Sequence, residues 1–133
     1  MRRRTAVSQP KNLRAMNIEE VRELGLALPH TTERCPYGPD CLVLEIGGKQ
    51  FCLLDLTGAW GFYNLKVDPD YSLALQDRYA GVRPGWHMNK KHWISVEYQA
   101  DVPDELQREL IEHAYRQTAK GLSKKVRQAL GLL

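Results

Sequence analysis

The sequence predicts a single α+β domain in which an antiparallel sheet packs against helices. Two strand-like runs flank Gly47-Gly48, and a further alternating run covers His92–Tyr98. Apolar residues also recur at helical spacing near both ends of the chain. A length of 133 residues fits one domain, and a domain of this size buries enough surface to fold without a metal or a disulfide.

Composition is that of an ordinary globular protein, with 43% hydrophobic and 26% charged residues. No apolar run approaches the roughly 18 residues that indicate a membrane span. No apolar block follows Arg2-Arg3-Arg4, which argues against a secretory signal. The three cysteines, Cys35, Cys41 and Cys52, form no Cys-x-x-Cys pair. We therefore expect a reducing, cytoplasmic setting, no structural zinc and no cofactor.

The first 15 residues are polar and basic, with five Lys or Arg and no acid, and they are predicted to be a disordered tail. Because Met16 begins a helix signal, this tail is alternatively an upstream start or a segment foreign to the native protein. Residues 16–133, the predicted domain, keep 14 Lys or Arg against 16 Asp or Glu and so carry about −2. Any attraction to phosphate must come from a local cluster or from the tail.

Four helices are predicted from their start and stop signals. Asn17 is a good N-cap with Glu20 three residues on, and Pro29 ends that helix. Asp68 and Ser123 cap two others, and acids in the first turn favour the long helix near the C-terminus. The expected ranges are 18–28, 69–78, 103–120 and 124–130.

The first hairpin is predicted at Gly47-Gly48, since a type I′ turn needs positive φ at both central residues. That turn places Ile46 opposite Lys49, with two further pairs on the core face. These are Leu44 opposite Phe51 and Leu42 opposite Leu53. A third strand is expected at 62–67, whereas His30–Asp40, with two prolines and a glycine, is predicted to be a loop.

A second hairpin is predicted for residues 84–98, with Asn89-Lys90 as a two-residue turn because Asn tolerates the left-handed region. A four-residue loop from Met88 to Lys91 gives the same pairing. Trp86 would then face Trp93 and His87 would face His92, with lysines at the tip. A bulge would undo this register.

Two hairpins that carry lysines, Lys49 on one and Lys90 and Lys91 on the other, could contact a nucleic-acid backbone together. The competing interpretation is a solvated tip whose lysines discourage edge-to-edge aggregation. Trp86 and Trp93 could likewise pack within the protein rather than stack on nucleic-acid bases. His87 and His92 could chelate a metal, but no third ligand has a persuasive spacing. No catalytic motif is recognised, and we expect no enzyme.

Four stretches resemble the MmcQ/YjbR family of small bacterial proteins. They are Tyr37-Gly38-Pro39-Asp40, Asn64-Leu65-Lys66-Val67-Asp68-Pro69, Gly85-Trp86-His87-Met88-Asn89-Lys90-Lys91-His92-Trp93 and Pro103-Asp104-Glu105-Leu106. The resemblance spans roughly residues 16–130, and its third stretch is the specific one. Tyr37 and Trp86 stand where other aromatics are expected.

The resemblance implies an α-β(3)-α-β(2)-α fold, similar to CyaY and type III secretion chaperones, and DNA binding through a double wing. Carried over to this chain, it points to a second wing containing Lys90 and Lys91, flanked by His87, Asn89, His92 and Trp93. Lys49 and Trp86 join this set from the hairpin interpretation. We expect weak, salt-dependent binding to DNA, by a monomer or homodimer, with a protein- or peptide-binding module as the alternative.

Overall fold

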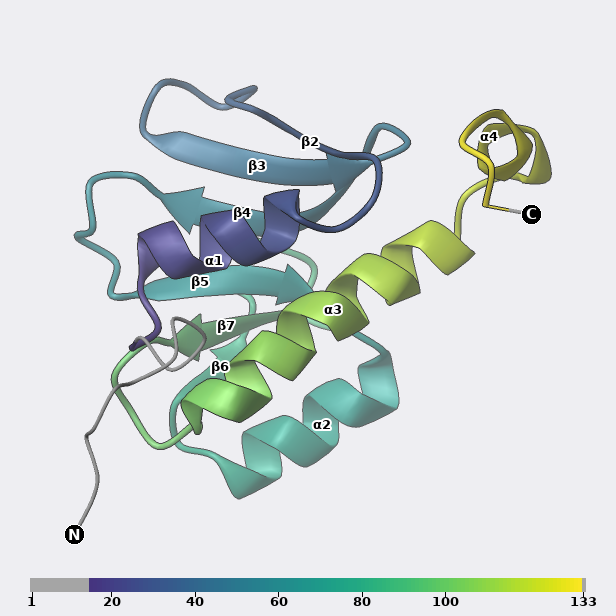
Figure 1. Ribbon diagram of the computed structural model, residues 1–133. Helices are drawn as coiled ribbons and strands as arrows, with labels where there is room; N and C mark the ends of the chain where they lie inside the picture. The colour runs from purple at the N-terminus through teal and green to yellow at the C-terminus, as the bar shows by residue number, and fades with distance from the viewer. Residues whose placement is uncertain (1–14, 133) are drawn as a thin grey trace, which may run out of the picture.

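The computed structural model describes residues 15–132, so residues 1–14 of the predicted tail lie outside the described residues. Helices and strands follow one another as shown in Figure 1. In chain order they are α1 (Ile18–Leu26), β2 (Thr31–Arg34), β3 (Cys41–Ile46), β4 (Lys49–Asp55), β5 (Phe62–Lys66), α2 (Pro69–Arg78), β6 (Val82–Pro84), β7 (Trp93–Glu97), α3 (Asp104–Lys120) and α4 (Lys124–Ala129).

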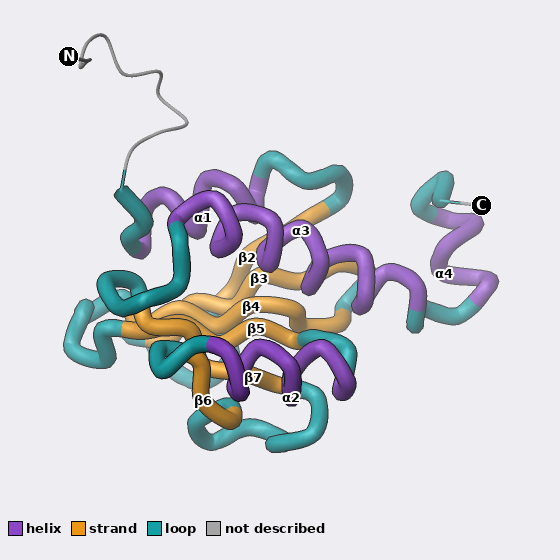
Figure 2. Tube along the Cα trace, turned by 90° about the horizontal axis from the view of Figure 1, so that it is seen from below, coloured by secondary structure: helices purple, strands orange, loops and turns teal. Residues whose placement is uncertain are grey.

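The strands form one six-stranded antiparallel sheet in the order β2-β3-β4-β5-β7-β6. Helices α1 and α3 lie side by side across one face of this sheet, and α2 lies near β6 and β7 (Figure 2). The α+β class and the antiparallel sheet predicted from the sequence are confirmed. We refer to the face opposite the helices as the open face.

Strand β2 corrects the prediction that His30–Asp40 is a loop. Thr31–Arg34 pairs with the outer edge of β3, Thr31 opposite Ile46 and Arg34 opposite Val43. Three of its four residues are exposed, so no alternating apolar pattern reveals it in the sequence. Charge pairs secure this edge strand instead, since Glu33 accepts from Arg22 and Arg34 donates to the buried Glu45.

The first hairpin has the predicted turn but not the predicted register. Gly47 and Gly48 have φ values of 59° and 80°, and Ile46 lies opposite Lys49. A bulge between Leu44 and Glu45 then shifts the pairing, so that Leu44 lies opposite Cys52 rather than Phe51, and Leu42 opposite Leu54 rather than Leu53. The bulge lets the adjacent Phe51 and Cys52 both reach the core.

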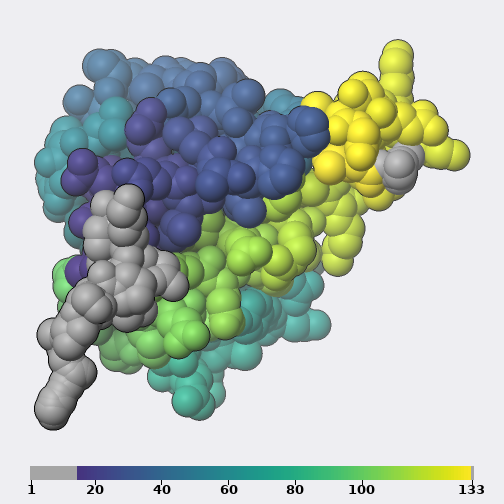
Figure 3. Space-filling view, in the orientation of Figure 1, coloured from purple at the N-terminus to yellow at the C-terminus, as the bar shows by residue number. Residues whose placement is uncertain are grey.

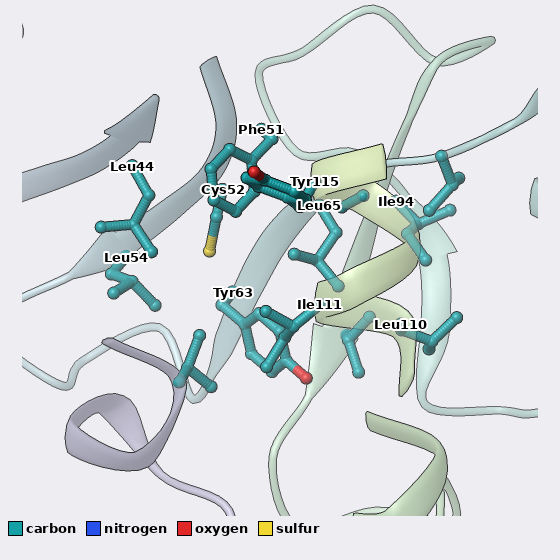
Figure 4. Close-up of a cluster of buried hydrophobic side chains, with 14 of the residues drawn as sticks. Leu44, Phe51, Cys52, Leu54, Tyr63, Leu65, Ile94, Leu110, Ile111 and Tyr115 are labelled. Atoms are coloured by element: carbon teal, nitrogen blue, oxygen red, sulfur yellow. The ribbon is translucent and has the colours of Figure 1, made fainter. Parts of the chain in front are cut away.

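The core lies between the sheet and α3 (Figure 4). Leu110, Ile111 and Ala114 of α3 are fully buried. One buried polar link crosses this layer, where the Tyr63 hydroxyl donates to Gln107 Oε1 at 3.0 Å. The Gln107 amide in turn donates to two backbone carbonyls, so that its polar atoms are satisfied.

Helices α1, α2 and α4 begin where the sequence predicts, and α3 begins one residue later than predicted, at Asp104. Asn17, Asp68 and Ser123 each accept a hydrogen bond from a backbone N–H in the first turn of their helix. None of the helices in the described part of the chain is long and apolar enough to cross a lipid bilayer.

Candidate binding groove on the open face

Alternate residues of the central strands point away from the helices and form a second apolar cluster on the open face. Val43, Leu53 and Trp93 are its buried members, and Cys41 and Met88 pack against them. Three loops border this cluster, at residues 35–40, 56–61 and 85–92. They bring together chain segments that are far apart in the sequence.

A groove of about 420 Å³ lies between these loops. Cys41, Leu53 and Asn64, from three neighbouring strands, line it from the sheet. Its remaining lining comes from the loops, namely Tyr37, Trp60, Trp86, His87 and Met88. A mostly apolar pocket with a few polar groups is the usual form of a ligand site.

The segment beside this groove is not the hairpin that the sequence predicts. Strand β6 ends at Pro84, opposite Ile94, and Gly85 rather than Trp86 lies against Trp93, donating from its N–H to the Trp93 carbonyl at 2.8 Å. The predicted pairs Trp86–Trp93 and His87–His92 are therefore wrong. The chain instead leaves the ladder at Gly85, and its next residues contact the open face.

Two local features build this folded-back loop. The Met88 N–H donates to the Gly85 carbonyl, and His87 between them adopts a left-handed φ of 58°. The Asn89 side chain then accepts from the N–H groups of Lys91 and His92. Asn89 thus stabilises the turn with its side chain, whereas the sequence interpretation placed it in the left-handed region.

Trp86 is fixed to the sheet by its backbone. Its N–H donates to Ser95 Oγ at 3.0 Å, and its carbonyl accepts from Asn64 Nδ2 at 3.1 Å. Ser95 Oγ donates in turn to Asn64 Oδ1 at 2.5 Å, which closes a three-residue network. Because Asn64 and Ser95 are opposite each other on β5 and β7 and are buried, this network holds the loop rigidly.

Aromatic rings gather at one end of the groove. Trp60 stacks on Phe62 with centroids 5.1 Å apart, and the Trp86 indole meets the edge of Trp60 at 4.8 Å. The His87 ring lies 4.0 Å from Trp86. Trp86 nevertheless stays 43% exposed, so one part of its indole is open to a ligand.

Trp60 is itself positioned by Asp55 at the end of β4. The Asp55 carboxylate accepts from the Thr57 hydroxyl and from the N–H of Trp60 at 2.9 Å. Burial alone would raise the pKa of Asp55, but the hydrogen bonds from Thr57 and Trp60 outweigh burial and lower this pKa below its ordinary value. The ionised carboxylate therefore stabilises the 56–61 loop.

The predicted basic residues are only partly brought together. Lys90 and Lys91 are exposed on the 85–92 loop, and the Lys90 ammonium donates to the Gly85 carbonyl. His92 is exposed and its carbonyl accepts from the Val67 N–H. Lys49 is exposed beside the β3–β4 turn, at the same end of the sheet but outside the groove lining.

Sequence reasoning missed six groove residues, which are Tyr37, Cys41, Leu53, Trp60, Asn64 and Met88. Tyr37 and Asn64 belong to two of the stretches that resembled the family, which was the available signal. Trp60 lies in a glycine-containing turn that carried no motif, and its side chain is half-buried in the structure. Within residues 15–132, no three His, Cys, Asp or Glu side chains are close enough together to hold a metal ion.

Comparison with known proteins defines the class to which this α+β fold belongs. Residues 26–117 match the family model described as YjbR. The protein YbdF of Escherichia coli O157:H7 is 41% identical over 107 residues, covering 80% of this chain and 88% of that protein. YjbR of E. coli K12 is 31% identical over 115 residues, 86% of this chain and 98% of that protein. Both relatives are described as uncharacterized.

Two solved structures have a fold similar to that of this chain. A Deinococcus radiodurans protein with a DUF419 domain has a TM-score of 0.81 and 31% identity, covering 94% of both chains. A Pseudomonas syringae protein has a TM-score of 0.65 and 25% identity over 77% of this chain and 99% of its own. The chain belongs to the YjbR family, and the resemblance first recognised in its motifs is confirmed.

Proposed function

We propose that this protein binds single-stranded nucleic acid weakly and with little sequence preference, across the groove on the open face. A base would stack on Trp86, and Lys91, with Lys90, would contact phosphates. The observation that carries this proposal is the half-exposed Trp86 indole, held rigidly at the groove beside a two-lysine turn. The proposal assigns no catalytic step to the site.

Aromatic exposure supports base stacking. Tyr37 is 60% exposed and lines the same groove as Trp86, so a planar ligand can contact both rings. Stacking of a base on an aromatic side chain is worth about 1–3 kcal/mol and tolerates any base, because every base has a π-face. Low sequence preference follows from this mode of contact.

The folded-back loop favours a single strand over a duplex. A projecting two-stranded ribbon could enter the major groove of DNA. Residues 86–88 instead line the groove on the open face, where the Trp86 indole would stack on an unpaired base. With a domain charge of about −2, phosphate attraction depends on local lysines, and binding should weaken steeply with salt.

The experiment is a fluorescence anisotropy titration of the full chain with a labelled single strand and with the matching duplex at several salt concentrations. Trp86→Ala should raise Kd for the single strand about five- to 150-fold. The anchoring hydrogen bonds of this residue come from its backbone, so they survive the change. Leu73→Ala removes a 67% exposed apolar side chain on α2 and is the matched control.

Phosphate contact has its own readout. Lys91→Ala should flatten the slope of log K against log salt by about 0.7 if the ammonium contacts one phosphate of a single strand. Arg78→Ala removes one positive charge from exposed α2 and should leave the slope unchanged. Replacing Arg2, Arg3 and Arg4 with Ser measures the tail. If only that triple variant loses binding, the groove has no part in it.

The apolar floor of the groove favours a second candidate, the binding of an apolar peptide. Leu53, Cys41 and Met88 offer contacts that a peptide side chain could use. Such binding would be insensitive to salt, whereas nucleic-acid binding would not. The same titration, repeated with a labelled peptide rich in Leu and Phe, separates the two candidates.

A further inference from the structure

The C-terminal part of the chain is strongly basic. Residues 113–132 contain Arg116, Lys120, Lys124, Lys125 and Arg127 and no Asp or Glu. They form the end of α3 and the short α4, which projects from the body of the molecule (Figure 3). Val126 and Leu122 pack this projection against the β3–β4 turn at Gly47. This projection is therefore attached to the domain through apolar contacts, which leaves its charged side chains available to bind a ligand.

A small cavity of about 210 Å³ lies between α3 and α4. Arg116 and Lys120, one helical turn apart, line it from α3, and Arg127 lines it from α4. Tyr115 and Leu132 complete much of the wall. Lys124 and Lys125 are exposed on α4 and do not line the cavity. Three of the five bases thus converge on one space from two helices.

The Arg127 guanidinium has an unsatisfied donor at this place. Its Nε is buried and has no hydrogen-bond partner in the described part of the chain. A buried donor without a partner is rare and costly, and a charged donor more so. Lys120 lies in the last turn of α3 and Arg127 in the last turn of α4, near the carbonyl end of each helix, but this attraction gives the Arg127 Nε no hydrogen-bond acceptor. The geometry lacks an acceptor where Arg127 needs one.

The field around the cavity is positive. Arg116 makes an ion pair with Glu112 of 3.5 Å, but both side chains are mostly exposed, so the pair neutralises little. Neighbouring His113 responds to this field. Its burial lowers its pKa first, and Arg116 and Lys120 lower it further, while Asp68 acts in the opposite direction. An anion in the cavity would find no carboxylate among the lining residues.

We propose that the α3–α4 cavity binds a phosphate group through Arg127, Lys120 and Arg116. A planar guanidinium pairs with two phosphate oxygens, and an ammonium reaches a third. The volume lies below the roughly 300–1,000 Å³ of sites for drug-sized ligands, which fits a phosphate with some water and not a whole nucleotide. The phosphate comes from a free phosphate monoester or from the backbone of a nucleic acid. The site does not depend on the groove proposal.

The test titrates inorganic phosphate into the full chain at low ionic strength and follows the Arg127 Nε–H resonance by NMR and the heat by calorimetry. Phosphate should shift this resonance with saturation. Arg127→Gln together with Lys120→Gln should weaken phosphate binding at least tenfold, which corresponds to about 1.4 kcal/mol. Lys124→Gln with Lys125→Gln removes the same charge from exposed positions and should weaken it less than twofold. Lys120 is exposed and Arg127 is half-buried, so a thermal melt of each variant verifies folding.

Equal losses in the two double variants, or no saturable shift, would overturn the proposal. The source is resolved by adding glycerol phosphate in one arm and a 12-nucleotide single strand in another. If the phosphate comes from a nucleic-acid backbone, Arg127→Gln with Lys120→Gln also weakens binding of the single strand. If it comes from a monoester, the double variant weakens binding of glycerol phosphate only. Lys91→Ala should leave phosphate binding unchanged in either case, so failure of the groove proposal and failure of this one are distinguishable.

Discussion

Replacing Gly85 with alanine tests whether the close approach of Gly85 to Trp93 positions the loop at the groove. A Cβ at residue 85 would lie 2.6 Å from the Trp93 Cβ and 3.0 Å from the backbone C and O of Trp93. These atoms belong to β7, which is paired with a strand on each side, and they cannot rotate away. The chain must therefore shift, and overpacking of this kind costs about 1–3 kcal/mol of unfolding free energy.

Gly121→Ala is the matched control. Neither glycine has a φ in the left-handed region, so alanine is allowed at both and the penalty at residue 85 is steric alone. At Gly121 the new Cβ would lie 3.6 Å from the Thr118 carbonyl oxygen, an ordinary contact. We expect Gly121→Ala to be neutral or to stabilise by up to about 1 kcal/mol, since alanine loses less backbone entropy on folding.

Urea unfolding followed by tryptophan fluorescence measures both variants. With an m value of about 2 kcal/mol/M, Gly85→Ala should lower the midpoint by roughly 0.5–1.5 M while leaving m unchanged. The Trp86 and Trp93 emission of the folded protein should also change, because their segment has moved. If Gly85→Ala is as stable as Gly121→Ala, the close approach does not position the loop.

Three further outcomes follow from other contacts. Ser95→Ala should cost about 2–4 kcal/mol in the same unfolding assay, because it leaves buried groups of Asn64 and the neighbouring loop without partners; a cost below 0.5 kcal/mol would contradict the network. Cys52 is buried and burial raises its pKa, whereas the half-buried Cys41 has a smaller rise, again chiefly from burial. A thiol reagent at pH 8 should therefore modify Cys41 slowly and Cys52 only after unfolding. The lowered pKa of Asp55 means that its stabilisation is full above the ordinary value of 3.8 and is lost as pH falls through the folded pKa. Asp55→Asn should flatten the pH dependence of the unfolding midpoint between pH 5 and about 2, and an unchanged dependence would refute this.

The sequence was sufficient to predict helix caps and turns that depend only on neighbouring residues. Asn17 caps α1 through its own side chain, and Gly47-Gly48 form their turn whatever lies beyond it. Helix α2 has the range that Asp68-Pro69 predicted. In each case the deciding contact lies within about four residues, so a pattern in the sequence can report it.

The predictions that were wrong concern segments whose structure depends on residues far away in the sequence. Strand β2 exists because the edge of β3 was available, and its Thr-Thr-Glu-Arg sequence has no buried face to reveal it. The bulge at Leu44 depends on how Phe51 and Cys52 pack below α3. The predicted register of the second hairpin was wrong for the same reason. The alternating pattern favoured Trp86 opposite Trp93, whereas a hydrogen bond from Asn64, 22 residues away from Trp86, holds the loop on the sheet.

The concentration of large side chains between Gly85 and Trp93 has a structural explanation, which narrows the functional one. Gly85 permits the close approach, Asn89 secures the turn, Lys90 donates to a backbone carbonyl and Trp93 fills the apolar floor. Each of these residues is engaged in folding the loop back. Lys91 is exposed, and its side chain forms no hydrogen bond or ion pair within residues 15–132. Trp86 keeps part of its indole exposed although its backbone is fully anchored. Function at this loop should therefore respond most to these two side chains, and a substitution elsewhere in it that abolishes binding must be tested first for loss of the fold.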